Sequence, residues 1–130
     1  MITDELKIII KLLCKIIRQR KLVSFYYESY KSKRKEWRTI RPYMILPVGA
    51  NIQLAGTPIE ELNKPKPEAG HYLIIKLDMA KFEILSETFD NPGVSRNIVA
   101  NTKSRVICRF IYNDEDVKEV KSKWIKLDEL

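Results

Sequence analysis

The stretch 22–46 constrains the fold most, because two β-prone runs flank a short basic loop. Residues 22–30 are dense in β-branched and aromatic side chains, and residues 37–41 supply a second such run. Side chains alternate between the two faces of a strand. The alternation separates a core-facing set from an outward-facing set: Val23, Phe25 and Tyr27 against Ser24, Tyr26 and Glu28. The pattern predicts a β-hairpin with its loop at residues 31–35.

The predicted loop is strongly basic and has aromatic neighbours. Its four cations are Lys31, Lys33, Arg34 and Lys35, and the nearby rings are Tyr26, Tyr27, Tyr30, Trp37 and Tyr43. Cations beside flat rings are typical of surfaces that bind single-stranded nucleic acid. The alternative is a solvated hairpin tip whose aromatic residues serve the core and the strands.

The overall charge favours polyanionic partners. The chain has 130 residues, 24 basic and 17 acidic, with a net charge of +7 and a pI near 9.4. Nucleic acid is the first partner class for such a chain, although ribosome-like and anionic-membrane contacts are steered by the same field. The length fits a single domain that needs no covalent staple.

The cysteines and the amino terminus indicate the compartment. Cys14 and Cys108 are the only cysteines, which is typical of a reduced intracellular protein with both thiols in the core. Lys7, Lys11 and Lys15 interrupt the amino-terminal apolar residues, so we expect neither a secretory signal nor a membrane span. We therefore expect a cytoplasmic protein without a membrane partner.

A helix is predicted from Thr3 to about Arg20. Thr3 is a suitable cap, and a regular apolar stripe follows: Leu6, Ile9, Ile10, Leu13, Ile16 and Ile17. Ile8, Leu12 and Cys14 widen that stripe. The helix should thus contact two surfaces, the domain body and a second subunit, which predicts a homodimer.

The remaining elements are mostly strands. We expect strands at 52–55, 71–77 and 105–112, a strand or short helix at 82–89, a long excursion at 56–70, and a turn at 90–93. Pro42 should end the hairpin pairing or lie at an edge. Asn113 should cap a final helix with Val117, Val120 and Trp124 on its buried face. The fold class is α+β, mainly β, in one domain of residues 1–130.

Catalysis has no obvious residue set. His71 is the only histidine, and Cys14 and Cys108 fall at expected core positions, so neither a metal site nor a cysteine nucleophile is expected. The four glycines form no phosphate loop. We expect a protein that is not an enzyme and needs no cofactor, with a small nucleic-acid-processing enzyme as the weakest alternative.

Motifs over residues 15–90 resemble the WYL domain of bacterial regulators. They are Val23-x-Phe25-x-Tyr27, Arg38-x-Ile40-x-Pro42-Tyr43, Ile52-Gln53-Leu54-Ala55-Gly56 and Ile75-Lys76-Leu77-Asp78, followed by Phe89. The resemblance implies a small Sm-like, SH3-type β-barrel at residues 22–90, after a helix at 1–21 and before a strand and helix at 91–130. It also implies ligand sensing, with single-stranded DNA or RNA as the ligand class, in transcription regulation, DNA-damage response or defence.

The resemblance places a ligand pocket at particular positions. They are Ser24 or Tyr27, Gln53, His71 and Lys76. The chain departs from the family where the Trp-Tyr-Leu tripeptide falls on Ile52-Gln53-Leu54, where Met79 replaces an arginine, and where one helix stands in place of a helix-turn-helix domain. Lys76 should leave the core face, because it alternates with His71, Leu73, Ile75 and Leu77.

The arginines and tyrosines of the hairpin allow two interpretations. Arg38 and Arg41 suit phosphate groups, but cross-strand pairing with Glu28 or Glu36 is equally compatible. Tyr43 and Tyr27 are either ligand contacts or core residues. The leading hypothesis is a module that binds single-stranded nucleic acid or a nucleotide-like ligand and acts through a partner protein or self-association. The alternative is a protein-interaction or scaffold domain with a degenerate pocket.

Overall fold

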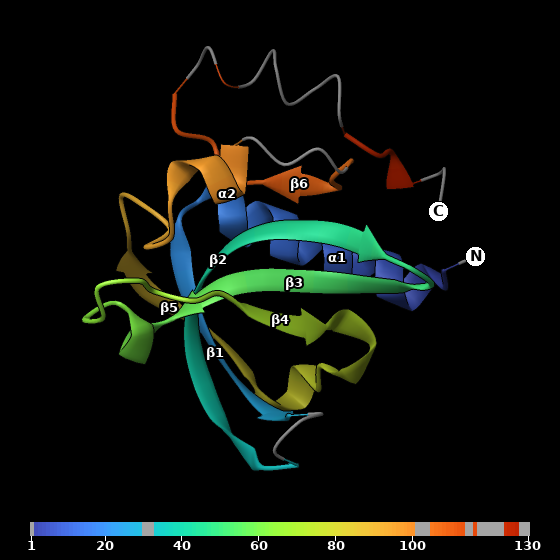
Figure 1. Cartoon of the computed structure of the whole chain (residues 1–130). Coiled ribbons are helices and arrows are strands. Elements are labelled where there is room, and N and C mark those ends of the chain that lie inside the picture. Colours follow the sequence, from blue (N-terminus) through green and yellow to red (C-terminus); the bar gives the residue numbers. More distant parts are fainter. Residues whose placement is uncertain (1, 30–32, 101–104, 114–115, 117–123, 128–130) are drawn as a thin grey trace.

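The computed structural model describes the chain except residues 1, 30–32, 101–104, 114–115, 117–123 and 128–130 (Figure 1). Its first element is the helix α1, Asp4–Arg18. The amide of Leu6 donates to Oγ1 of Thr3 at 3.2 Å, so the predicted cap is confirmed. Ile10, Leu13, Ile16 and Ile17 form the buried face of α1, which packs against the sheet.

The body of the protein is an antiparallel sheet. Its strands are β1 Lys21–Glu28, β2 Lys35–Val48, β3 Asn51–Pro58, β4 Gly70–Leu73, β5 Phe82–Thr88 and β6 Cys108–Arg109. Their order is β4-β3-β2-β1-β5, with β6 beside β2. Short helices complete the fold: η1 Ile59–Glu61, η2 Ile74–Lys76, η3 Met79–Lys81 and α2 Arg96–Ala100. The predicted α+β, mainly β, class is confirmed.

The predicted hairpin forms, but its second strand is longer than expected. β1 and β2 pair from Glu28 and Lys35 to Val23 and Ile40. Pro42 follows at once, so it ends the pairing with β1 as expected. It does not end β2, because β3 pairs along the other side of that strand, with a register shift just after Pro42. Beyond this point β6 takes the side of β2 that β1 has left.

The strand predicted at 71–77 is wrong after Leu73. The chain there enters η2, which breaks the two-residue alternation. Tyr72 and Ile74 are buried, whereas Ile75 is 74% exposed; of the core-facing set that sequence alternation predicted, only Leu77 is buried. Lys76 is exposed as expected, although from a helical turn.

The carboxy-terminal part keeps little regular strand. Of the strand predicted at 105–112 only β6 forms, although the Ile107 and Phe110 amides still donate to carbonyls of β2. The segment predicted at 82–89 forms the strand β5, Phe82–Thr88. The 90–93 turn also forms, and in it the Gly93 amide donates a hydrogen bond to Oδ1 of Asn91. Asn113 accepts from the Asp116 amide at 3.0 Å, as a cap would. Val117 and Val120 lie outside the described residues.

The sheet curls until its β4 edge approaches β1. The rings of Tyr72 on β4 and Phe25 on β1 have centroids 5.1 Å apart, and the Leu73 amide donates to the Tyr27 hydroxyl at 3.0 Å. These contacts are made by side chains. Within the described residues no backbone pairing joins β4 to β5, so the sheet stays open and the expected closed barrel is not found. None of the described helices is long and apolar enough to cross a membrane.

Candidate functional site

An aromatic pair lies on the outward side of the β1–β2 hairpin. Tyr26 and Trp37 are direct partners in the strand register, and their ring centroids are 6.2 Å apart. Trp37 is 52% exposed. Nζ of Lys81 lies 4.7 Å from the Tyr26 ring centroid, a cation–π contact. We call Tyr26, Trp37 and Lys81 the aromatic face.

The basic loop continues from this face. Lys33, Arg34 and Lys35 are exposed, and the Lys33 amide donates to the Ser29 carbonyl at 2.8 Å, which closes the hairpin turn. Lys35 begins β2 two residues before Trp37, on the same side of the strand. Positive charge therefore adjoins the exposed Trp37 ring and the half-buried Tyr26 ring, as the sequence predicted. Lys31 and Tyr30 lie outside the described residues.

Three predicted contact residues of the hairpin have structural partners instead. The Ser24 hydroxyl accepts from the Thr39 hydroxyl at 3.1 Å across the strand pair. Tyr27 is 6% exposed, and its hydroxyl oxygen accepts a hydrogen bond from the Leu73 amide. Tyr43 is 2% exposed. Burial, with a smaller effect of Tyr112, raises the pKa of Tyr43 to about 12. Neither Tyr27 nor Tyr43 offers a ring face to a nucleic acid, because the core covers both.

Arg41 anchors a turn. Its guanidinium donates to the Asn91 carbonyl at 3.1 Å and lies 5.6 Å from the ring centroid of Phe89. These contacts join β2 to the 90–93 turn. Arg41 pairs with neither Glu28 nor Glu36, the two partners expected from the sequence, and the contacts that it makes are structural.

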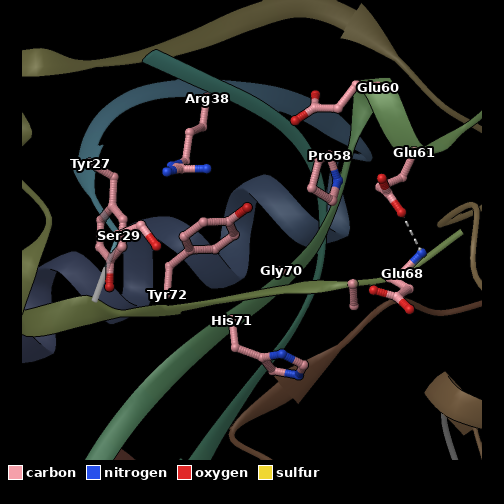
Figure 2. Close-up of a pocket in the computed structure, with 11 residues that line it drawn as sticks. Tyr27, Ser29, Arg38, Pro58, Glu60, Glu61, Glu68, Gly70, His71 and Tyr72 are labelled. Carbon is pink, nitrogen blue, oxygen red and sulfur yellow. Dashed lines mark hydrogen bonds between the residues drawn. The ribbon is translucent and has the colours of Figure 1, made fainter. Parts of the chain in front are cut away.

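A pocket of about 460 Å³ opens where β4 and η1 meet the inner side of the hairpin (Figure 2). It brings together three predicted residues, Tyr27, Arg38 and His71. Arg38 pairs with Glu36 of its own strand at 3.3 Å, whereas the expected pairing was cross-strand. In Figure 2 the Tyr72 ring lies between Tyr27 and the η1 glutamates, and the exposed His71 points to the other side of β4.

The charge of the pocket is mainly negative. Its lining carries Glu60, Glu61 and Glu68 against the single guanidinium of Arg38. Lys64 hydrogen-bonds Glu61, and together with the Glu68 amide it lowers the pKa of the Glu61 carboxyl. A polyanion would meet three carboxylates here, so the pocket does not suit a phosphate chain.

Two further predicted ligand residues lie outside this pocket. Gln53 is half-buried on β3 opposite Leu73 of β4, and Lys76 is at the end of η2. Neither lines the cavity that holds Tyr27 and His71. The structure thus divides the predicted site, with a basic and aromatic surface on one side of the hairpin and an acidic pocket on the other.

The sequence contained a signal for the aromatic face that the prediction of site residues missed. Counting alternately from the apolar set places Tyr26 outward, and strand pairing places Trp37 opposite it. Lys81 has no such local signal. It reaches Tyr26 because Phe82 pairs with Phe25, 57 positions away along the chain.

Comparisons with known proteins bear on the fold. No protein-family model matches the chain, and no curated protein does. Among solved structures, the proteasome accessory factor B/C (PafBC) of Arthrobacter aurescens matches with a TM-score of 0.51 and 12% identity, over 62% of this chain and 12% of that one. A CRISPR Cas-related protein matches with a TM-score of 0.40 and 18% identity, over 95% of this chain and 29% of its own. The chain thus shares the fold of a small part of PafBC.

Proposed function

We propose that this chain is a ligand-sensing module that binds single-stranded nucleic acid on the aromatic face of its β1–β2 hairpin. The observation that carries the proposal is the exposed Trp37 beside Tyr26, with Lys81 over the Tyr26 ring. The exposed Trp37 ring offers a stacking position for a base, with the half-buried Tyr26 beside it, and every base has a face that can stack. No catalytic step is part of the proposal.

The nearby charges support the same ligand. Lys33, Arg34 and Lys35 follow the hairpin beyond the rings, and the whole chain carries a net charge of +7. Lysine and arginine side chains on such a path neutralise phosphates while the rings hold the bases. A side-chain ring can stack on an unpaired base, whereas a duplex keeps its bases stacked on one another, so a flexible single strand fits this surface better than a duplex.

We infer a regulatory role from the WYL-like motifs together with the fold. The first three motifs lie on β1, β2 and β3 of the curled sheet, and the motif at 75–78 lies on η2 and the two residues after it. A module of this kind senses its ligand in transcription regulation, DNA-damage response or defence and passes the signal to a partner protein or a second copy. α1 offers a surface for that contact, since its Ile8 is 67% exposed.

The test compares a short single-stranded oligonucleotide with a duplex of equal length. Wild-type protein should prefer the single strand, and Trp37→Ala should weaken that binding about 5- to 150-fold, the effect of losing one stacking contact. Ile75→Ala is the matched control, because Ile75 is an exposed apolar residue on η2, away from the aromatic face. Equal affinity for strand and duplex, or no effect of Trp37→Ala, would refute the proposal.

A second candidate function rests on the acidic pocket. Its three glutamates suit a basic side chain of a partner protein, and the buried Nε of Arg38 has no hydrogen-bond partner among the described residues. This favours the protein-interaction hypothesis with an altered ligand pocket. Purification at low salt separates the two candidates, because a nucleic-acid binder retains material that absorbs at 260 nm and an interaction domain does not.

A further inference from the structure

The only two cysteines of the chain meet where α1 packs on β6. Cys14 lies in the third turn of α1, Cys108 begins β6, and their thiols hydrogen-bond to each other. Both are free thiols. The sequence predicted both as core residues, and only the tertiary structure reveals the pair.

The two thiols differ in access. Cys108 is 1% exposed, whereas Cys14 is half-buried and lines a groove of about 350 Å³ between α1 and the segment around Trp124. Lys11 and Arg18 also line this groove. A small oxidant in this groove therefore reaches the sulfur of Cys14 first.

The two thiols also differ in acidity. The hydrogen bond from Cys108 lowers the pKa of Cys14 against the effect of partial burial, and the positive charge of Arg18 adds to that lowering. Burial and the Cys14 contact raise the pKa of Cys108. Because the thiolate is the reactive form, Cys14 is the nucleophile of the pair.

We propose that Cys14 and Cys108 form an oxidisable pair that closes into an intramolecular disulfide when a peroxide enters the groove. The Cys14 thiolate attacks the O–O bond of hydrogen peroxide, a sulfur–oxygen bond forms, and hydroxide leaves, so the sulfur becomes a sulfenic acid. The Cys108 sulfur then attacks that sulfur, the sulfur–oxygen bond breaks, and water leaves with the proton of the Cys108 thiol. The new disulfide bond links α1 covalently to β6.

Oxidation should stabilise the junction between α1 and β6 and should leave the structure of the aromatic face unchanged. The disulfide closes the chain between residues 14 and 108, and such a long closure restricts the unfolded state. The thermal midpoint of the oxidised protein should rise and should return on reduction with dithiothreitol. Binding of a single strand by Trp37 and Tyr26 should not change, so the outcome here is distinguishable from that of the proposed function.

The test treats the full chain with hydrogen peroxide and counts thiols after denaturation. We expect both thiols to disappear together, with a mass loss of two hydrogens and a monomer on a non-reducing gel. In Cys108→Ser or Cys108→Ala, Cys14 should stop as a sulfenic acid that a dimedone probe labels, and in Cys14→Ser the Cys108 thiol should persist. Two surviving thiols in wild-type protein, loss of Cys14 alone, or disulfide-linked dimers would each overturn the proposal.

Discussion

Tyr26 and Trp37 are direct cross-strand partners whose ring planes stand at 86° to each other. On the opposite side of β1, Phe25 and Tyr27 are buried against Tyr72. One strand thus sends alternate aromatic residues to the core and to the surface. Substitutions on the outward side should change binding without unfolding the protein, which makes the proposed interface separable from stability.

Binding to a single strand should depend steeply on salt. If the four cations of residues 31–35 neutralise phosphates, the slope of log affinity against log salt should be about −2.8, a loss of roughly 50-fold between about 50 and about 200 mM. Replacing all four by glutamine should flatten the slope by about 2.8 and leave only the contribution of cations outside the loop, such as Lys81. The control replaces Lys7, Lys11 and Lys15 of α1, which should leave most of the slope intact. A slope that the loop substitutions do not change would assign the loop to the solvated-tip interpretation.

The cation over Tyr26 should contribute separately from the loop. Lys81→Ala removes the contact at 4.7 Å, and Lys81→Glu places a carboxylate beside the path of the phosphates. We expect weaker binding for the alanine, with a salt slope flatter by about 0.7 because one cation beside the phosphates is lost, and a larger loss for the glutamate. Fluorescence anisotropy with a labelled single strand measures both. Equal losses for the two variants would mean that the Lys81 charge does not face the ligand.

Local patterns predicted the elements that local forces decide. The Thr3 cap, the α1 stripe and the alternation of β1 were correct, because each depends on residues a few positions apart. The prediction of a strand at 71–77 was wrong because Tyr72 and Ile74 pack against distant core residues, and a helical turn allows both side chains to be buried. The residue pattern of this segment alone does not indicate those partners.

The candidate site was only partly predictable for the same reason. The basic loop and its neighbouring rings are adjacent in sequence, so their surface could be anticipated. The pocket gathers Glu60 and Glu68 from η1 and the segment before β4, next to Arg38 from β2, and this juxtaposition depends on how the sheet curls. The sequence therefore predicted contacts with a polyanion at Tyr27, Arg38 and His71, and the fold places these residues beside the carboxylates of the pocket.

Gly70→Ala should destabilise the curled edge of the sheet. A Cβ at this position would overlap the hydroxyl of Tyr72 and lie 2.6 Å from its Cζ. The ring cannot move aside, because it packs edge-to-face on Phe25 and Tyr27. We expect a loss of about 1–3 kcal/mol in urea unfolding, the usual cost of overpacking. Tyr72→Phe removes the closest atom, so adding it to Gly70→Ala should recover part of the loss; no recovery would place the strain elsewhere.

A buried ion pair should make stability depend on acid pH. Arg109 and Asp116 are 3% and 4% exposed, and two hydrogen bonds of 2.6 and 2.8 Å join them. Burial opposes ionisation of the carboxyl, but the bonds from Arg109 and the Tyr112 amide outweigh it and lower the pKa of Asp116. Removing one partner alone, as in Asp116→Ala, should cost about 3–5 kcal/mol because the guanidinium stays buried without its charge partner.

The pH dependence follows from the sign of that shift. A carboxyl whose pKa is lower in the folded state binds fewer protons there, so its stabilisation is complete above the unfolded pKa of about 3.9 and is lost as pH falls through the folded value. Urea midpoints between about pH 7 and pH 3 should therefore decline on the acid side in wild-type protein. The double variant Arg109→Met with Asp116→Leu removes both charges, and its midpoint should decline less over the same interval. An equal decline in both proteins would assign the acid sensitivity to other carboxylates.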